Sequence, residues 1–415
     1  MNLDKNSTPR APLLGVAQAL DYIRTSLTPI TGFEQRALRD ALERVLAADV
    51  HSPIDVPPHA NSAMDGYALR SADLPRNGEA ALQLIGTALA GHPFNGTVDS
   101  GQCVRIMTGA KLPAGTDTVV MQENIRREGE TVYVESAQRQ GDNVRLPGED
   151  IATGQKVLSQ GRSLTPADLG LLASLGIAEV KVMRRLRVAF FSTGDELRSL
   201  GETLDEGQIF DSNRYTLYGM LQRLGVEIID MGVVRDRRED IAAAFRQGAA
   251  VADVLLTSGG VSVGDADYVK ETLETLGKVN FWKIAMKPGK PLAFGLLGNT
   301  AFFGLPGNPV SSMATFYQIV QPALCQLMGR TAELPLRLCV PCVTQLKKSP
   351  GRADYQRGIL EYDASGQLTV RSTGPQGSHV LSSMSRANCF IILPAESGNM
   401  EAGNLVEVQP FAGLI

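Results

Sequence analysis

RVAFFST at residues 187–193 is the first of three apolar runs that decide the fold, and EIIDMGVV at 227–234 and DVLLTS at 253–258 are the others. Each run is rich in β-branched and other apolar residues, as strands are. Helix-like stretches follow the three runs, at 215–224, 239–250 and 266–276. Strands that alternate with helices predict a mostly parallel sheet with right-handed crossovers. A further strand is predicted at 279–286, and Gly298-Asn299 between two apolar runs predicts a hairpin.

Three loops with unusual composition follow predicted strands. They are Ser192-Thr-Gly-Asp-Glu-Leu197, Thr257-Ser-Gly-Gly-Val-Ser-Val-Gly-Asp265 and Gly304-Leu-Pro-Gly-Asn-Pro-Val-Ser-Ser312. Because ligands of parallel α/β sheets bind beyond the carboxyl ends of the strands, we expect these loops to meet at one edge. One such loop alone is more often a tight turn, whereas three at one edge favour a phosphate-binding rim.

Two of these loops offer backbone N–H groups to an anion. Asn308 fits the N-cap of a helix and Pro309 its first position, which leaves unpaired N–H groups at the positive end of the helix dipole. Gly307 removes side-chain bulk there. Ser258, Gly259 and Gly260 offer similar N–H groups in a nest-like turn.

Charged side chains gather at the same predicted edge. The carboxylates are Asp195, Glu196, Asp236, Asp265 and Asp267. Mg²⁺ prefers one or two carboxylates, several waters and phosphate oxygens, which this set can supply, although any single Asp is more often a cap or a surface charge. Lys287-Pro-Gly-Lys-Pro291 adds two cations on a stiff turn. This turn favours a clamp for a small dianion over two solvated lysines.

The pattern changes outside this segment. Residues 11–50 have a helical periodicity, with apolar faces formed by Leu14, Ala17, Leu20, Ile23 and Leu27 and by Leu38, Ala41, Leu42, Val45 and Leu46. Residues 60–150 carry short alternating runs and glycine turns, typical of a small, mostly β domain, in which two loops present Asp65 and Thr108. Residues 151–182 are mixed. From residue 331 the β texture returns and predicts a small barrel or sandwich.

Composition excludes several classes of protein. Lys and Arg total 40 against 44 Asp and Glu, a formal net charge of -4, whereas a general nucleic-acid binder needs an excess of cations. The aromatic fraction of 6% does not favour base stacking. No stretch reaches the roughly 18 uninterrupted apolar residues of a membrane span, and residues 1–10 lack the apolar core of a secretory signal. We therefore expect a cytoplasmic protein without a nucleic-acid or membrane partner.

Cysteine and histidine give no clear metal site. Cys339 and Cys342 form a CxxC motif, but the chain has no second CxxC and no nearby histidine pair. A redox or zinc role remains open, and buried thiols in a β segment are favoured. The four histidines are scattered, and the chain has no Walker loop and no GxGxxG motif.

Seven motifs occur in the order found in one family. They are Asn61-Ser-Ala-Met-Asp-Gly-Tyr67, Met107-Thr-Gly-Ala110, Gly148-Glu-Asp150, Ser192-Thr-Gly-Asp-Glu196, Ser258-Gly-Gly-Val-Ser262, Lys287-Pro-Gly-Lys-Pro291 and Gly304-Leu-Pro-Gly-Asn-Pro309. On these motifs the chain resembles, from about residue 11 to its end, the bacterial molybdopterin molybdenumtransferases (MoeA), relatives of the gephyrin E domain. The resemblance implies an L-shaped homodimer of four-domain subunits, with an active site shared between subunits because the domain with Asp65 faces the α/β rim of the other copy.

Texture and resemblance together give the expected fold class: multidomain α/β plus β. A central α/β domain with a mostly parallel sheet would span 183–330 and a small mostly β domain 53–149. An elongated mixed domain would combine 1–52 with 150–182, and a C-terminal β-barrel-like domain would span 331–415.

The resemblance also implies a reaction, the Mg²⁺-dependent insertion of molybdate into adenylylated molybdopterin, which releases AMP and gives molybdenum cofactor. A molybdopterin adenylyltransferase would be the upstream partner. Positions that match residues important for activity are Asp65, Thr108, Asp150, Glu196, Asp236 and Asp267. Mg²⁺ would bind Asp236 or Asp267. Those that match residues holding molybdate are Lys287, Lys290, Ser311, Arg357 and Ser378, and those in matching pterin-site segments are Lys283, Pro306 and Pro309. Ser262 would join Ser258 at the substrate rim.

Two departures and two alternative functions accompany the resemblance. His59-Ala60 stand where the family usually has Phe-Asp, and Phe210 replaces a common Tyr. A molybdopterin adenylyltransferase resembles residues 185–330 alone, so the flanking domains argue against that activity. A scaffold without catalysis, like the receptor-clustering role of gephyrin, is disfavoured because the carboxylates and lysines are intact.

Overall fold

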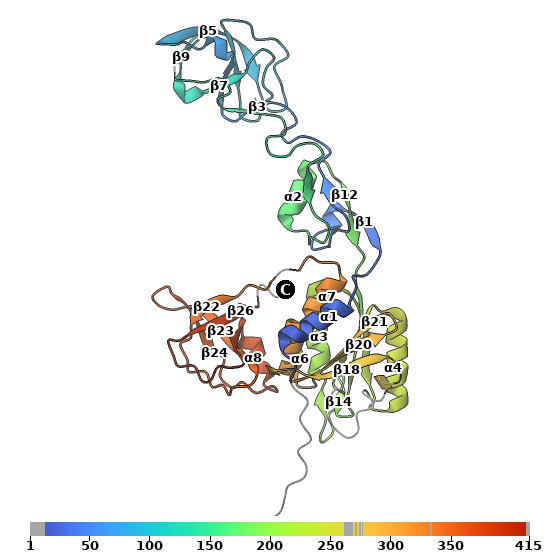
Figure 1. Cartoon of the computed structure of the whole chain (residues 1–415). Coiled ribbons are helices and arrows are strands. Elements are labelled where there is room, and N and C mark those ends of the chain that lie inside the picture. The colour runs from blue at the N-terminus through green and yellow to red at the C-terminus, as the bar shows by residue number, and fades with distance from the viewer. Residues whose placement is uncertain are drawn as a thin grey trace, which may run out of the picture.

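The structure is a computed structural model that describes residues 13–135, 137–260, 277–332 and 334–411, together with residues 269, 272, 273 and 275. Figure 1 shows an elongated molecule with an α/β domain and a C-terminal β domain side by side at one end. A small module with α2, β1 and β12 follows, and a β domain with β5, β7 and β9 lies at the far end. The expected multidomain class, α/β plus β, is confirmed.

The sheet of the α/β domain has six strands in the order β16-β13-β17-β21-β20-β18. Their bounds are β13 Arg187–Thr193, β16 Glu227–Val234, β17 Val254–Ser258, β18 Lys278–Lys283, β20 Pro291–Leu297 and β21 Thr300–Leu305. The pairs among β16, β13, β17 and β21 are parallel, whereas β20 pairs antiparallel with β21 and with β18. The mostly parallel sheet is therefore confirmed, as is the hairpin at Gly298-Asn299.

Helices cover both faces of this sheet. They are α1 Val16–Ser26, α3 Ser212–Leu224, α4 Arg238–Val251, α6 Pro309–Thr315 and α7 Gln321–Leu327, the last two joined by a π-helical turn, Phe316–Val320. The predicted helices at 215–224 and 239–250 are confirmed. The one predicted at 266–276 lies mostly outside the described residues.

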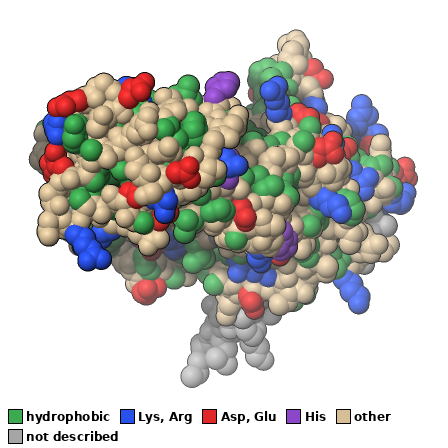
Figure 2. Space-filling view, turned by 90° about the horizontal axis from the view of Figure 1, so that it is seen from above, with side chains coloured by type: hydrophobic (Ala, Val, Ile, Leu, Met, Phe, Trp, Pro, Cys, Tyr) green, Lys and Arg blue, Asp and Glu red, His purple; other side chains and the backbone are tan. Residues whose placement is uncertain are grey.

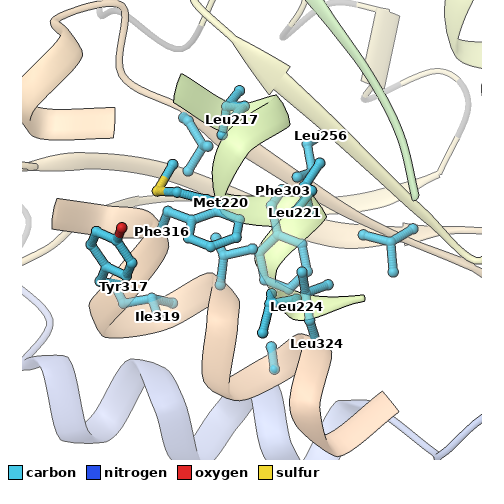
Figure 3. Packing of buried hydrophobic residues seen from close by; sticks show 14 of the residues in the cluster. Leu217, Met220, Leu221, Leu224, Leu256, Phe303, Phe316, Tyr317, Ile319 and Leu324 are labelled. Atoms are coloured by element: carbon cyan, nitrogen blue, oxygen red, sulfur yellow. The ribbon is translucent and has the colours of Figure 1, made fainter. Parts of the chain in front are cut away.

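Strand β13 explains the two layers of helices. Val188 and Phe190 point into a core cluster that contains residues of α1, α3, α6 and α7, and Ala189 and Phe191 point into a second cluster with α4. Side chains alternate between the faces of a strand, so an uninterrupted apolar run such as RVAFFST must be covered on both faces. Figure 3 shows the larger cluster, where side chains of α3 meet those of the sheet and of the segment from α6 to α7.

The N-terminal segment differs from its prediction. Residues 16–26 are helical, but the second predicted helical stretch contains strand β1 Phe33–Ala37, a single 3-10 turn at Leu38–Asp40, and isolated bridges at Val45 and Leu46. Ala41 and Leu46 are buried with Leu172 and Val182, and Val45 is buried in the core of the α/β domain. Leu42 is 44% exposed, so the pattern predicted most of the burial but not the backbone conformation. Pairing of β1 with β12 overrides helix propensity here.

The two domains that follow are small. The module contains β1, β2 Val50–His51, β11 Lys156–Leu158, α2 Pro166–Ser174 and β12 Glu179–Met183. The β domain contains β3 Asn61–Ser62, β4 Gly66–Leu69, β5 Glu79–Ala88, β6 Gln102–Ile106, β7 Thr118–Met121, β8 Ile125–Glu128, β9 Thr131–Glu135 and β10 Val144–Arg145, with 3-10 turns at Ser71–Asp73 and Gln122–Asn124. Because α1 packs in the core of the α/β domain, the N-terminal helix does not join the module. The predicted boundaries themselves stay predictions.

The C-terminal domain is a curled β sheet. Its elements are β19 Met286–Lys287, β22 Leu338–Pro341, β23 Ala353–Tyr362, β24 Leu368–Ser372, α8 Leu381–Arg386, β25 Cys389–Leu393 and β26 Leu405–Pro410, in the path β19-β23-β25-β26-β22 with β24 beside β23. Cys342, just after β22, bridges to Val370 of β24, which brings the two sides of the sheet together. The barrel-like form is the expected one.

This domain is joined firmly to the α/β domain. Tyr317 lies 6.1 Å from Phe411 and 6.3 Å from Phe390 between ring centroids, and Gln318 donates to Gln409 at 2.8 Å. The side chains of Tyr317, Phe390, Gln318 and Gln409 are buried. Buried aromatic contacts with a satisfied polar pair hold two domains in one arrangement.

The two cysteines of the CxxC motif differ in solvent exposure. Cys342 is buried and Cys339 is exposed, so the favoured interpretation of two buried thiols is wrong for Cys339. In the described part of the chain, no group of three His, Cys, Asp or Glu side chains could hold a metal ion.

The surface carries both signs of charge. On the face shown in Figure 2, acidic and basic side chains are interspersed with apolar ones. The described helices include none that is long and apolar enough to cross a bilayer.

Candidate active site

Two of the predicted rim loops meet at Asn213, near the start of α3. Its Nδ2 donates to Ser258 Oγ and to the carbonyl of Gly307, both at 2.7 Å. The N–H of Gly259 also donates to the carbonyl of Leu305, at 3.1 Å. The loops after β17 and β21 therefore form one surface, as expected from the parallel topology.

Glycine is required in the turn after β17. Gly259 and Gly260 have φ angles of +93° and +67°, and a Cβ on Gly259 would lie 2.6 Å from the carbonyl oxygen of Thr193. Only glycine adopts this backbone so close to a neighbouring strand end without strain. Of the predicted rim residues, Ser262 lies outside the described residues.

The loop after β21 begins α6 as predicted. Asn308 is the N-cap and Pro309 the first helical residue, but the Asn308 side chain makes no capping hydrogen bond. The N–H of Val310 donates to the carbonyl of Ser378 at 3.1 Å. One N–H that the sequence left unpaired is thus taken by the C-terminal domain. Pro306 is buried and Gly307 exposed.

Three carboxylates lie together beyond β13 and β16. The N–H of Asp236 donates to Asp195 Oδ1 at 3.3 Å, and Glu196 is the next residue. Burial raises the pKa of Asp236 above its ordinary value, and the charges of Asp195 and Glu196 raise it further. A divalent cation would relieve this repulsion, but the three carboxylates are not placed to hold a metal ion together, as no such group of three occurs in the described residues. One or two of them, with waters and phosphate oxygens, make up the set of ligands that Mg²⁺ prefers. Asp267, the other predicted ligand, lies outside the described residues.

The Lys287-Pro-Gly-Lys-Pro291 turn lies between α6 and the C-terminal domain. Lys287 pairs in register with Asp354 of β23, and its Nζ lies 3.3 Å from Asp354 Oδ2. A Cβ on Gly289 would lie 2.5 Å from Thr315 Oγ1 of α6. Lys290 and Lys283 are exposed. The turn thus places Lys287 on a buried carboxylate and leaves Lys290 in solvent, where Lys283 at the end of β18 also lies.

Arg357 lies on β23, three residues after Asp354. It is fully buried, and burial lowers the pKa of its guanidinium to about 10. Nη2 donates to the carbonyl of Gly377 at 3.0 Å, beside Ser378, whose carbonyl holds the start of α6 next to Ser311. The backbone therefore links Arg357, Ser311 and Ser378 at one junction, which the turn bearing Lys287 adjoins.

A second group of predicted residues lies in the β domain. Asp65 Oδ1 accepts from the N–H of Thr108 at 2.7 Å and from its Oγ1 at 2.8 Å. The backbone N–H and then the hydroxyl of Thr108 hold the pKa of Asp65 below its ordinary value. Asp150 is exposed, in the segment that returns to the module. In Figure 1 the module separates the β domain from the α/β sheet, so one chain does not unite the two groups.

Two residues of this site, Asn213 and Asp354, were missed. Asn213 lies three residues after Phe210, but its role as a bridge has no local signature. Asp354 carried no signal, because its partner lies 67 residues away in sequence.

Comparison with known proteins decides the family. Residues 14–176 match the MoeA N-terminal region (domain I and II), 189–326 a probable molybdopterin binding domain, and 340–411 the MoeA C-terminal region (domain IV). The chain belongs to the MoeA family. It is 46% identical over 405 residues to a molybdopterin molybdenumtransferase of Haemophilus influenzae, covering 97% of this chain and 100% of the relative.

Two further relatives fit this assignment. A gephyrin of Dictyostelium discoideum is 35% identical over 425 residues, which cover 90% of this chain and 59% of that protein. A crystal structure of a MoeA protein from Pyrococcus horikoshii superposes with a TM-score of 0.79 at 31% identity, covering 96% of this chain and 99% of that one. This member of the MoeA family is an enzyme of molybdenum cofactor biosynthesis, a molybdopterin molybdenumtransferase by its relatives.

Proposed function

We propose that the chain inserts molybdate into adenylylated molybdopterin, with Mg²⁺, and releases AMP and molybdenum cofactor. The observation that carries this proposal is the junction of α6, the Lys287 turn and β23. It gathers a buried guanidinium, a lysine and two serines, which suit a tetrahedral dianion. The rim formed by Ser258, Gly259 and Gly307 would hold the phosphates of the nucleotide.

Separate groups of residues would bind molybdate, the pterin and Mg²⁺. Arg357, Lys287 and Lys290 supply positive charge to molybdate, and Ser311 and Ser378 supply neutral donors. Lys283, Pro306 and Pro309 line the pterin segment, beside the rim that Asn213 holds together. Mg²⁺, when bound by Asp236 or Asp267, would polarise the pyrophosphate. Molybdate gains two bonds to the dithiolene sulfurs and loses one oxygen, which leaves as water with the two thiol protons. One water molecule adds to the pyrophosphate, whose P–O bond breaks to release AMP and leave the phosphate on the pterin.

The proposal includes a second copy of the chain. Asp65, Thr108 and Asp150 lie in or beside the β domain, away from the α/β sheet of the same chain. A homodimer in which each β domain faces the rim of the other copy would unite both groups. A molybdopterin adenylyltransferase would deliver the adenylylated pterin.

One assay separates the possible reactions. We would incubate the protein with adenylylated molybdopterin and molybdate, with Mg²⁺ or with EDTA, and measure AMP and active cofactor by reconstitution of a cofactor-free molybdenum enzyme. The proposal predicts both products together, only with Mg²⁺ and molybdate. Formation of adenylylated pterin from molybdopterin and ATP, without molybdate, would instead identify an adenylyltransferase. Failure to rescue a strain that lacks molybdenum insertion would favour a scaffold.

A further inference from the structure

Arg357 is a buried charge without a counter-ion among the described residues. Its side chain is 0% exposed, and no ion pair of the described chain includes it. The nearby carboxylate, Asp354, pairs with Lys287 instead. Burying a charge without a counter-ion is unfavourable, and a bound anion would offset that penalty.

Ser383 of α8 fixes the direction of this guanidinium. Arg357 Nε donates to Ser383 Oγ at 3.0 Å, and Ser383 Oγ donates to the carbonyl of Val380 at 2.6 Å. A hydroxyl has a single proton, and that proton is used on Val380. Ser383 therefore accepts from Nε, and the carbonyl of Gly377 accepts from Nη2, which leaves Nη1 as the nitrogen without a hydrogen bond in the described structure.

Gln376 fixes the backbone of the same arginine from both sides. Its Oε1 accepts from the N–H of Arg357 at 2.8 Å, and its Nε2 donates to the carbonyl of Arg357 at 3.1 Å. The next residue, Gly377, accepts from Nη2, and Ser378 then receives the N–H of Val310 in α6. The loop from 373 to 380 thus sets the guanidinium against the start of α6.

We infer that Ser383 and Gln376 are positioning residues that aim the Arg357 guanidinium at a tetrahedral oxyanion. This inference rests on the proposed function, since molybdate is the oxyanion in question. Neither residue needs to touch molybdate. A guanidinium offers strong recognition only when its N–H groups are held in the plane and direction of the anion's oxygens.

The test compares the effect of each substitution on the KM for molybdate with its effect on the KM for the adenylylated pterin. Ser383→Ala should raise the KM for molybdate roughly tenfold, since one hydrogen bond to a charged group is lost, and should leave the KM for the adenylylated pterin unchanged. Gln376→Met should act in the same direction. Equilibrium dialysis with molybdate should give the same loss of affinity. The matched control is Ser385→Ala, because Ser385 is exposed on the same helix.

Non-additivity distinguishes positioning from stability. In an Arg357→Met background, Ser383→Ala should have no further effect on molybdate affinity. An additive effect, or an equal loss for both substrates, would overturn the inference, as would a normal molybdate KM in Ser383→Ala when Arg357→Met alone is impaired. If Arg357→Met itself binds molybdate normally, the proposed oxyanion site fails, and the inference fails with it.

Discussion

At the scale of single residues, the site is set by polar groups whose partners are few and specific. Asp236 has two carboxylate neighbours, and Asn213 joins two loops with one amide. The pKa of Asp236 and the hydrogen bonds of Asn213 both depend on burial and on a neighbour at a fixed position. Substitution of either side chain should therefore have a measurable effect.

Asp236→Asn should stabilise the protein at neutral pH while lowering activity. A raised pKa means that the folded state holds this proton more tightly than the unfolded chain, so ionised Asp236 destabilises the fold above its folded pKa. We expect Tm at pH 7 to rise by about 1 °C. The gain should shrink as the pH falls through the folded pKa, because the wild-type carboxyl is then protonated. Thermal melts of both proteins between pH 4 and 8 would measure this difference in Tm.

The control for this substitution is Glu130→Gln, in an exposed turn of the β domain. Its melting temperature should not change over the same pH range. A lower Tm for Asp236→Asn at pH 7 would contradict repulsion among the three carboxylates.

Asn213→Ala should weaken pterin binding selectively. The substitution leaves Ser258 Oγ and the Gly307 carbonyl without their shared donor, at a cost of about 1–3 kcal/mol. Because the rim loops then lose their fixed spacing, the KM for the adenylylated pterin should rise roughly tenfold while the KM for molybdate stays unchanged. Gln222→Ala, exposed on the same helix, is the control. Unaltered pterin kinetics in Asn213→Ala would remove Asn213 from the substrate rim.

At the scale of elements, the short strand β19 and its turn connect two domains. β19 pairs parallel with β23, and the following turn approaches α6 at Gly289. One segment of a few residues therefore sets the position of Lys287 relative to both the rim and Arg357.

Gly289→Ala should disturb this junction. Gly289 has a φ of +104°, and the added Cβ would lie 2.5 Å from Thr315 Oγ1. Strain and contact together should cost about 2–3 kcal/mol of unfolding free energy and raise the KM for molybdate. Gly298→Ala is the matched control, with a φ of +61° and no atom within 4 Å of its Cβ, and should cost about 1 kcal/mol. Denaturant unfolding and molybdate titrations give both values, and equal costs would argue against the contact.

At the scale of the whole molecule, the proposed site needs two chains. The β domain stands apart from the α/β sheet of its own chain, while the α/β and C-terminal domains share buried contacts. A mixed dimer of Asp65→Asn and Arg357→Met chains should therefore regain about half of the wild-type activity, because one of its two sites combines two unaltered halves.

Two affinity tags would isolate the mixed dimer, and each variant alone should be inactive. Asp65→Asn dimers mixed with Asp65→Asn dimers carrying the other tag serve as the control. No activity in the mixed dimer would show that both halves of the site come from one chain.

Local patterns predicted part of this fold well. The strands around Phe190 and Leu256 and the hairpin at Gly298 were predicted because apolar runs and turn residues act over a few neighbours. Residues 33–46 failed because a helix-like pattern records burial, whereas pairing with β12 decides the backbone. Pattern alone cannot weigh a partner nearly 150 residues away.

The sequence by itself determined the α/β core, the glycine and proline turns, and the motifs that mark the family, because these depend on residue types at short spacing. Only the tertiary structure decided that the carbonyl of Ser378 accepts from the N–H of Val310, that Asp354 pairs with Lys287, and that Ser383 accepts from Arg357. Each of these is a hydrogen bond or ion pair between segments far apart in the chain. Such contacts exist only once the chain has folded, since direction and burial, not residue identity, select the partner.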